Sequence, residues 1–304
     1  MISSLIFHLV LLFIAAPFLS GVIARTKALI AGRRGQPVLQ LYFDIWKLLR
    51  KGMVLSSTTT WVFRAGPVVA LVVPILAAML LPFGPISATI SFKGDIILFV
   101  YLLALARFFT VLAALDTGSS FEGMGAAREV TFAILVEPTI FVSFIVLARI
   151  AQNFSLNSMF GHVAPAGHFH PATSIALLLI AFCLFIVLLA ENSRIPFDDP
   201  NTHLELTMIH EVMVLDHSGP DLGLIFYGAA MKLMLFGILV LDLILPDTGN
   251  ILADIVVFLL GLPVLAVCIG LVESAMARLR LIRVPQLLIG TTLLSFFALI
   301  LLLR

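Results

Sequence analysis

The sequence predicts an all-α polytopic membrane protein with about eight transmembrane helices and one amphipathic helix in its first loop. Composition is the first of two observations that predict this class. Hydrophobic residues make up 61% of the chain and charged residues only 12%, and the mean hydropathy is +1.17. So much apolar surface cannot be buried in one water-soluble core, so a lipid bilayer is the expected solvent. We treat residues 1–304 as a single transmembrane domain.

The second observation is that apolar segments long enough to cross roughly 30 Å of hydrocarbon recur along the whole chain. They cover approximately residues 2–24, 62–83, 95–115, 129–152, 172–193, 223–246, 251–276 and 286–303. The first segment is similar in length to a signal peptide, but no basic residue precedes it and several follow it. We therefore expect a retained helix rather than a cleaved one.

Lysine and arginine are distributed unevenly between the connecting loops. The connection between the first two segments carries Arg25, Lys27, Arg33, Arg34, Lys47, Arg50 and Lys51. The connection after the seventh segment is also basic, whereas the even-numbered connections carry only Lys93. Loops rich in lysine and arginine stay on the cytoplasmic side. We therefore expect the odd-numbered loops in the cytoplasm and both termini outside.

Two of the expected cytoplasmic loops are long enough to have functions of their own. In the first, residues 25–60, apolar positions recur at helical spacing, with Asp44, Lys47 and Arg50 on the opposite side. This pattern predicts an amphipathic helix, which either lies in the membrane interface or packs on its own bundle. The second loop, residues 194–222, is rich in acidic residues and histidines.

Several ionisable residues fall inside the apolar segments, where an unpaired charge costs roughly 2.5 to 3.5 kcal/mol on insertion scales. They are Arg107, Glu137, Lys232, Asp242 and Glu273, with Glu129 and Glu191 nearer the cytoplasmic ends. One structural ion pair, for example between Arg107 and a carboxylate, would explain one or two of them. The set as a whole favours a hydrated path for ions or protons. Pro138 next to Glu137 frees backbone carbonyls that water can satisfy.

Lys232 lies near the middle of the sixth segment and needs a partner at that depth. Asp242 is ten residues away on the same helix, roughly 15 Å along its axis, which is too far for contact. We therefore expect a carboxylate from another helix, with Glu137, Glu191 and Glu273 as the candidates.

The sequence predicts no metal site and no cofactor in this chain. Its three histidines in the loop at 194–222 are seven residues apart, roughly 10.5 Å on a helix, so they cannot share one metal ion. Both cysteines stand alone in apolar runs, which leaves no iron–sulfur or zinc pattern. The net charge of +1 gives no basic surface for nucleic acid, which is not an expected partner.

Three motifs resemble those of subunit 1 of respiratory complex I. "AENSRIPFDDPNTHLELT" is similar to its signature of a basic residue, PFD and an acidic run, and "GRRGQPVLQLYFDIWKLLRKG" is similar to its first loop. "GAAREVTFAILVEP" resembles its arginine followed nine residues later by glutamate. Within that superfamily, "ALDTGSSFEGMGAAREVTFAILVEP", "GAAMKL" and "VESAMARLRL" resemble the membrane-anchor subunit of group 4 nickel–iron hydrogenases of the formate hydrogenlyase and hydrogenase-4 type.

This resemblance implies a non-catalytic subunit of an oxidoreductase complex in a bacterial or archaeal cytoplasmic membrane. Its expected partners are hydrogenase-like large and small iron–sulfur subunits on the cytoplasmic side, which hold the nickel–iron centre and the clusters, and antiporter-like membrane subunits. A quinone is a possible further cofactor. The alternatives are a quinone-binding subunit of a complex I-like dehydrogenase and an independent ion transporter.

The expected roles of single residues follow from the resemblance together with their depth and charge. The expected proton-relay residues are Arg128, Glu129, Glu137, Glu191, Asp198, Asp199, Glu205, Asp216, Lys232 and Glu273. The residues expected to dock the redox arm or to line a cavity beneath the first loop are Arg25, Arg33, Arg34, Phe43, Asp44, Lys47, Arg194, His203 and His210. Histidine replaces some of the family's acids and titrates near pH 6.5, so it can serve in a relay. The acidic loop is expected to feed Glu137, Lys232 and Glu273.

Overall fold

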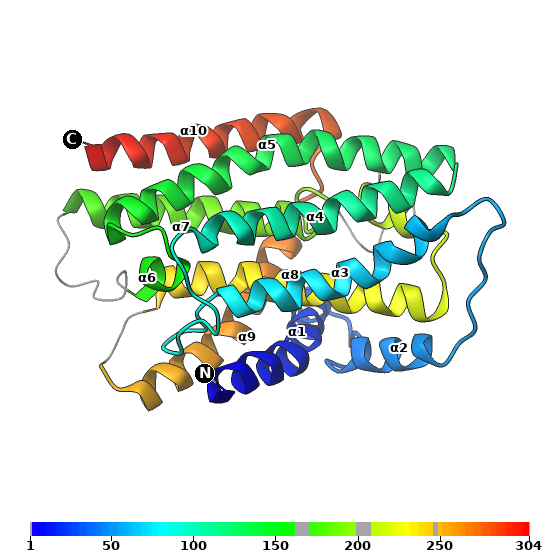
Figure 1. The fold of residues 1–304 in the computed structure, drawn as a ribbon, viewed down its shortest axis with the longest axis horizontal. Helices are drawn as coiled ribbons and strands as arrows, with labels where there is room; N and C mark the ends of the chain where they lie inside the picture. The colour runs from blue at the N-terminus through cyan, green and yellow to red at the C-terminus, as the bar shows by residue number, and fades with distance from the viewer. Residues whose placement is uncertain (1, 162–170, 199–207, 246–248, 304) are drawn as a thin grey trace.

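Long helices run side by side along one axis of the molecule in the computed structural model (Figure 1). The structure describes residues 2–161, 171–198, 208–245 and 249–303. In these residues the helices are α1 (Ile2–Ile30), α2 (Gln40–Leu49), α3 (Trp61–Leu80), α4 (Asp95–Asp116), α5 (Ser120–Ala151), α6 (Leu156–Gly161), α7 (Pro171–Glu191), α8 (Gly219–Ile244), α9 (Ile251–Ala275) and α10 (Val284–Leu303), with 3-10 turns η1 (Glu211–Val214) and η2 (Leu281–Arg283).

The predicted all-α class and the eight membrane-spanning segments are confirmed. Among the described residues, eight helices are long and apolar enough to cross a membrane, namely α1, α3, α4, α5, α7, α8, α9 and α10. We call the end at which α1, α4, α7 and α9 finish the basic end of the bundle, because the basic first loop lies there. The opposite end is the far end.

The helix starts carry recognisable sequence signals. Thr60 caps α3, because its hydroxyl accepts a hydrogen bond from the backbone N–H of Val62 at 3.3 Å. Asn250 caps α9 in the same way through Leu252 at 3.1 Å. Side-chain acceptors at this position satisfy N–H groups that have no partner within the helix. Pro220 occupies the first turn of α8, where a missing N–H costs nothing.

Three helices extend by four residues or more beyond their predicted bounds at the basic end. α1 ends at Ile30 rather than at 24, α5 begins at Ser120 rather than at 129, and α8 begins at Gly219 rather than at 223. The extra turns of α5 are polar but are covered by the segment around η1. A side chain at Gly125 would overlap Val212, so that position admits close approach of the two segments. Tertiary packing therefore extends a helix that the apolar pattern ends early.

The predicted amphipathic helix is α2, and it packs on its own bundle. Ile45 is buried, and Leu48 contacts the α8 backbone at Gly223. Figure 1 shows α2 beside the beginning of α8. Its opposite side is apolar and exposed, with Phe43 and Trp46 uncovered. The short helix α6 was not predicted, because six residues are too few for a periodic pattern to stand out.

Helices α3 and α8 approach each other closely in the centre of the bundle. At Gly228 a Cβ atom would overlap the backbone carbonyl of Ala70, so only glycine allows this approach. Small residues at crossing points let membrane helices pack backbone to backbone. The contact holds α8, which carries Lys232, against α3.

We expect Gly228→Val to force α3 and α8 apart and to destabilise the protein by about 1 to 3 kcal/mol, the usual cost of overpacking. Gly290→Val on α10 is the matched control, because nothing lies within 4 Å of a Cβ atom there. The thermal unfolding midpoint of the purified protein in detergent measures the difference. Equal midpoints for the two variants would contradict the close-contact role.

Candidate functional site

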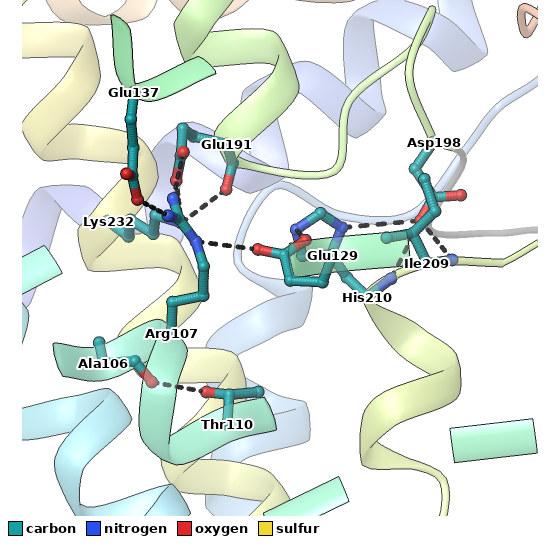
Figure 2. A network of polar contacts seen from close by, with 10 residues as sticks. All are labelled: Ala106, Arg107, Thr110, Glu129, Glu137, Glu191, Asp198, Ile209, His210 and Lys232. Carbon is teal, nitrogen blue, oxygen red and sulfur yellow. Dashed lines mark hydrogen bonds and ion pairs between the residues drawn. The ribbon is translucent and has the colours of Figure 1, made fainter. Parts of the chain in front are cut away.

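The side chain of Arg107 joins three helices in the middle of the bundle (Figure 2). Arg107 lies on α4 and its side chain is only 11% exposed. Its Nη1 lies 2.8 Å from Oε1 of Glu137, and its Nε lies 3.2 Å from Oε1 of Glu129, both on α5. Its Nη2 also donates a hydrogen bond to Oε1 of Glu191 at the end of α7. One guanidinium therefore neutralises part of the charge of three carboxylates.

Lys232 of α8 extends this cluster to a fourth helix. Its Nζ lies 2.7 Å from Oε2 of Glu191 and 2.8 Å from the backbone oxygen of the same residue. The expectation that a carboxylate from another helix pairs with Lys232 is confirmed, and that partner is Glu191. The two oxygens of Glu191 are thus shared between Arg107 and Lys232 (Figure 2).

His210 connects the buried cluster to the basic end of the bundle. Its Nε2 lies 3.0 Å from Oε2 of Glu129, and its Nδ1 lies 3.7 Å from Oδ2 of Asp198. Asp198 also accepts hydrogen bonds from the backbone N–H groups of Ile209 and His210, at 3.1 and 3.2 Å. Its other oxygen lies 2.9 Å from Nη2 of Arg278. The ionisable groups therefore form a continuous series of contacts. In order, they are Arg278, Asp198, His210, Glu129, Arg107, Glu191 and Lys232.

The surroundings of His210 favour its charged form. Burial by itself would lower its pKa, but the carboxylates of Glu129 and Asp198 raise the pKa to about 9. For Asp198, burial opposes ionisation, yet His210 and Arg278 lower its pKa. His217 differs, because burial lowers its pKa to about 4. It is stacked on Phe63 with ring centroids 3.9 Å apart. The pKa values of both histidines therefore lie away from the usual value of 6.5.

The structure gathers much of the predicted relay set into one place. Glu129, Glu137, Glu191, Asp198 and Lys232 all belong to the connected groups. His210, predicted for docking or the cavity, lies at the centre of their connection. Arg107 was counted among the ionisable residues at membrane depth but was left out of the predicted relay set, although it makes more of the ionic contacts than any other member. Its depth in an apolar segment was the available signal.

Other predicted relay residues lie apart from this chain of contacts. Arg128 donates to the backbone oxygen of Met208 at 2.9 Å. Asp216 is exposed, and its backbone N–H donates to Glu122. Asp199 and Glu205, and His203 of the docking set, lie outside the described residues.

Glu273 belongs to a second buried cluster. Its carboxylate lies 2.8 Å from Nζ of Lys27 and 3.4 Å from Nη1 of Arg194. Glu273 was one of three candidate partners for Lys232, and among the described residues that partner is Glu191 instead. The partner of Glu273 comes from α1, because the end of α1 packs against the end of α9: a Cβ atom at Gly270 would meet Thr26 at 2.8 Å.

A cavity of about 420 Å³ lies between α2 and the connected ionisable groups. Its lining includes small apolar residues such as Gly21 and Ala70. It also includes Arg107, Glu129 and Lys232. The cavity therefore gives a molecule on the α2 side direct access to the charged groups.

Only part of the predicted docking and cavity set lines this cavity. Asp44, Arg194 and His210 do so. The other described members, Arg25, Arg33, Arg34, Phe43 and Lys47, do not line it, and their role in docking or in a cavity stays a prediction. All of these except Arg25 are exposed. Arg25 is half-buried and donates to the backbone oxygen of Arg34.

Known proteins match this chain over nearly its whole length. The model of the NADH dehydrogenase family matches residues 2–303. The chain is 33% identical to formate hydrogenlyase subunit 4 of Escherichia coli (strain K12), over 91% of this chain and 90% of that protein. It is also 33% identical to hydrogenase-4 component C of the same organism, over 90% and 87%.

A solved structure adds a likeness in fold alone. In the structure of the membrane-bound sulfane sulfur reductase, an archaeal respiratory membrane complex, one chain matches with a TM-score of 0.84 at 22% identity. The match covers 99% of both chains. At that level of identity the likeness extends to the path of the helices and not to the reaction of the complex.

The raised pKa of His210 predicts a pH-dependent contribution to stability. Folding raises this pKa from 6.5 to about 9, so the contribution is complete below pH 6.5 and is lost as the pH rises through about 9. We expect the free energy of unfolding of wild type to exceed that of His210→Gln by up to roughly 3 kcal/mol at pH 6. This difference should be lost by pH 10. Thermal unfolding at a series of pH values measures it. His217→Gln is the control, and its trend has the opposite sign. Folding lowers the pKa of His217 to about 4, so wild type gains up to about 1 kcal/mol over this variant as the pH rises from 6 to about 8 and nothing further up to pH 10.

Removing the guanidinium of Arg107 is expected to be severe, because three carboxylates then lose their shared cation. Breaking a buried ion pair from one side typically costs about 3 to 5 kcal/mol. Arg107→Met should reduce the amount of folded protein in membranes, and Arg107→Met with Glu137→Gln should recover part of it. Arg149→Met, which removes an exposed arginine at the far end of α5, serves as control. Equal losses in the single and double variants would contradict the charge-balancing role.

Proposed function

We propose that this chain, which belongs to the NADH dehydrogenase family, is the membrane-anchor and proton-conducting subunit of a complex I-like, membrane-bound nickel–iron hydrogenase. One observation carries the proposal. The ionisable side chains from Asp198 to Lys232 lie in continuous contact inside a bundle of membrane-spanning helices. The 33% identity to formate hydrogenlyase subunit 4 and hydrogenase-4 component C supports the hydrogenase type of complex.

In this proposal the chain itself performs no redox chemistry. The nickel–iron centre and the iron–sulfur clusters belong to large and small hydrogenase-like subunits, which dock at the basic end of the bundle on the cytoplasmic side. Both termini then face outward, as the distribution of lysine and arginine indicates. The two loops proposed for docking meet there, because the backbone N–H of Val54 donates to the hydroxyl of Ser218 at 3.1 Å. They therefore offer the arm one continuous surface.

The proposed coupling begins at His210 and Asp198. A redox event in the docked arm changes the local charge or moves the segment that carries His210, and either change alters the cost of holding a proton there. A proton released from His210 has Glu129 as its nearest described acceptor, at 3.0 Å. Arg107 stays protonated and holds the carboxylates of Glu129 and Glu191 close together. In the proposal, water in the cavity that Glu129, Glu191 and Lys232 line carries the proton between them.

Beyond Lys232 the geometry supports a lateral route rather than one along α8. All residues of α8 from Leu233 to Leu241 are buried and apolar. No ionisable group lies in that stretch, which is roughly 12 Å long at 1.5 Å per residue. We propose that protons pass sideways to antiporter-like membrane subunits of the same complex.

The cavity beneath α2 supports the quinone-binding subunit of a complex I-like dehydrogenase as a second candidate function. Its volume of about 420 Å³ lies within the usual range of sites for small molecules, roughly 300 to 1,000 Å³. Its apolar lining residues suit a lipid-soluble ring, and its charged lining residues could exchange protons with it. Quinone that co-purifies with the complex in place of nickel would favour this candidate over the hydrogenase.

The proposed function predicts that Lys232→Met uncouples the complex. Hydrogen turnover with an artificial electron carrier should stay within about twofold of wild type, because the redox centres lie in other subunits. Proton movement per turnover should fall by about tenfold or more, because methionine cannot hold a proton at this position. A loss of about 1.4 kcal/mol in the free energy of binding the proton already gives a factor of ten. Purified complex in sealed vesicles with a pH-sensitive dye measures both. Lys93→Met, an exposed lysine at the far end, is the control. Unchanged proton movement in Lys232→Met would refute the relay.

A further inference from the structure

Glu137 is the one member of the connected groups that opens onto the outer surface of the bundle. One oxygen contacts Arg107 at 2.8 Å, and the second has no partner among the described residues. The side chain is 39% exposed, whereas that of Glu191 is 4% exposed and that of Glu129 is 9% exposed. Glu137 does not line the cavity beneath α2, so this exposure does not belong to that cavity.

Position along α5 places this open carboxylate deep in the membrane. Glu137 lies seventeen residues from the start of α5 and fourteen from its end, roughly 25 and 21 Å at 1.5 Å per residue. Lipid headgroups lie beyond the hydrocarbon core of roughly 30 Å and are out of reach. Hydrocarbon chains offer no hydrogen-bond donor, and an open carboxylate facing them is strongly disfavoured.

The residues around Glu137 form a surface suited to another helix. Val130, Ile134, Phe141 and Ile145 are exposed on α5 at intervals of four, seven and four residues, so they lie along one side of the helix. Ile134 and Phe141 precede and follow Glu137 by three and four residues and flank it on that surface. An apolar stripe with one carboxylate at its edge matches a transmembrane helix that carries a single donor at the same depth.

We propose that the α5 surface around Glu137 is the docking site for a second membrane subunit of the complex. A transmembrane helix of that subunit would place a proton-bearing side chain, most simply a lysine ammonium, against the free oxygen of Glu137. Charge complementarity selects this occupant over lipid. The inference deepens the proposed function, because it rests on the connected groups being a relay and makes Glu137 the point at which that relay meets the neighbouring subunit.

Site-specific photocrosslinking in the intact complex tests the docking surface. The photoreactive residue benzoylphenylalanine replaces Ile134, which is 63% exposed. The matched control is Leu260 on α9, which is 61% exposed and lies fifteen residues from the end of its helix at the basic end, as Ile134 lies fourteen from the start of α5. Figure 1 shows α9 on the opposite side of the bundle from α5. We expect a crosslink from position 134 to a co-purified membrane subunit and no crosslink to that subunit from position 260.

Mass spectrometry of the crosslinked peptide decides the chemistry of the partner. A transmembrane segment with a lysine or another proton-bearing side chain close to the crosslink supports the proposal. A crosslink to lipid only, or to a segment that is entirely apolar, overturns it. Failure to crosslink in a complex that retains all its membrane subunits also overturns it.

Glu137→Gln separates this inference from the proposed function. The glutamine keeps the shape and the contact with Arg107, so the crosslink from position 134 should persist while proton movement per turnover falls severalfold. A retained crosslink with unchanged proton movement removes the relay role and leaves the docking surface standing. Loss of proton movement in a complex without the crosslink removes the docking surface and leaves the relay standing.

Discussion

The charge of Arg107 in the middle of an apolar bundle is the constraint on which the arrangement of the other groups depends. Taking one guanidinium out of water costs several kcal/mol, and only close partners make up that cost. Glu129, Glu137 and Glu191 supply them from two helices. Three carboxylates exceed one cation, so Lys232 and His210 are required in turn. With His210 protonated, the four positive groups Arg107, Lys232, His210 and Arg278 balance the four negative groups Glu129, Glu137, Glu191 and Asp198.

Because of this charge balance, the contacts that hold His210 in place depend on whether its imidazole is protonated. Asp198 holds the backbone at Ile209 and His210 through two hydrogen bonds and holds Arg278 through an ion pair. The backbone N–H of Leu279 also donates to the backbone oxygen of Pro196 at 2.9 Å, so a second contact joins the segment of Arg278 to that of Asp198. Loss of the proton from His210 would leave Glu129 and Asp198 facing a neutral ring. The segment that carries His210 thus links a proton to the shape of the basic end of the bundle.

The sequence allowed the fold to be predicted more fully than the site. Membrane-spanning helices depend on local composition, and the eight apolar segments could be read directly. Depth in those segments also identified Lys232 and Glu137 as ionisable residues that need partners. Which carboxylate meets which cation depends on the rotation and neighbours of each helix, and one sequence does not encode these locally. For this reason Glu273 remained a candidate partner of Lys232, and Arg107 was left out of the predicted relay set. His210 illustrates the same limit, because its pKa is set by Glu129, eighty-one positions earlier in the chain.

The apolar stretch of α8 from Leu233 to Leu241 has an electrical consequence. A transmembrane voltage falls mainly across the part of a protein that excludes water and mobile charge, and 100 mV acts on one elementary charge with about 2.3 kcal/mol. The connected groups from Asp198 to Lys232 lie on one side of that insulating layer. A proton held on these groups has therefore not yet crossed that layer. In the proposed relay, the electrical work of the layer falls on a later step, outside these groups.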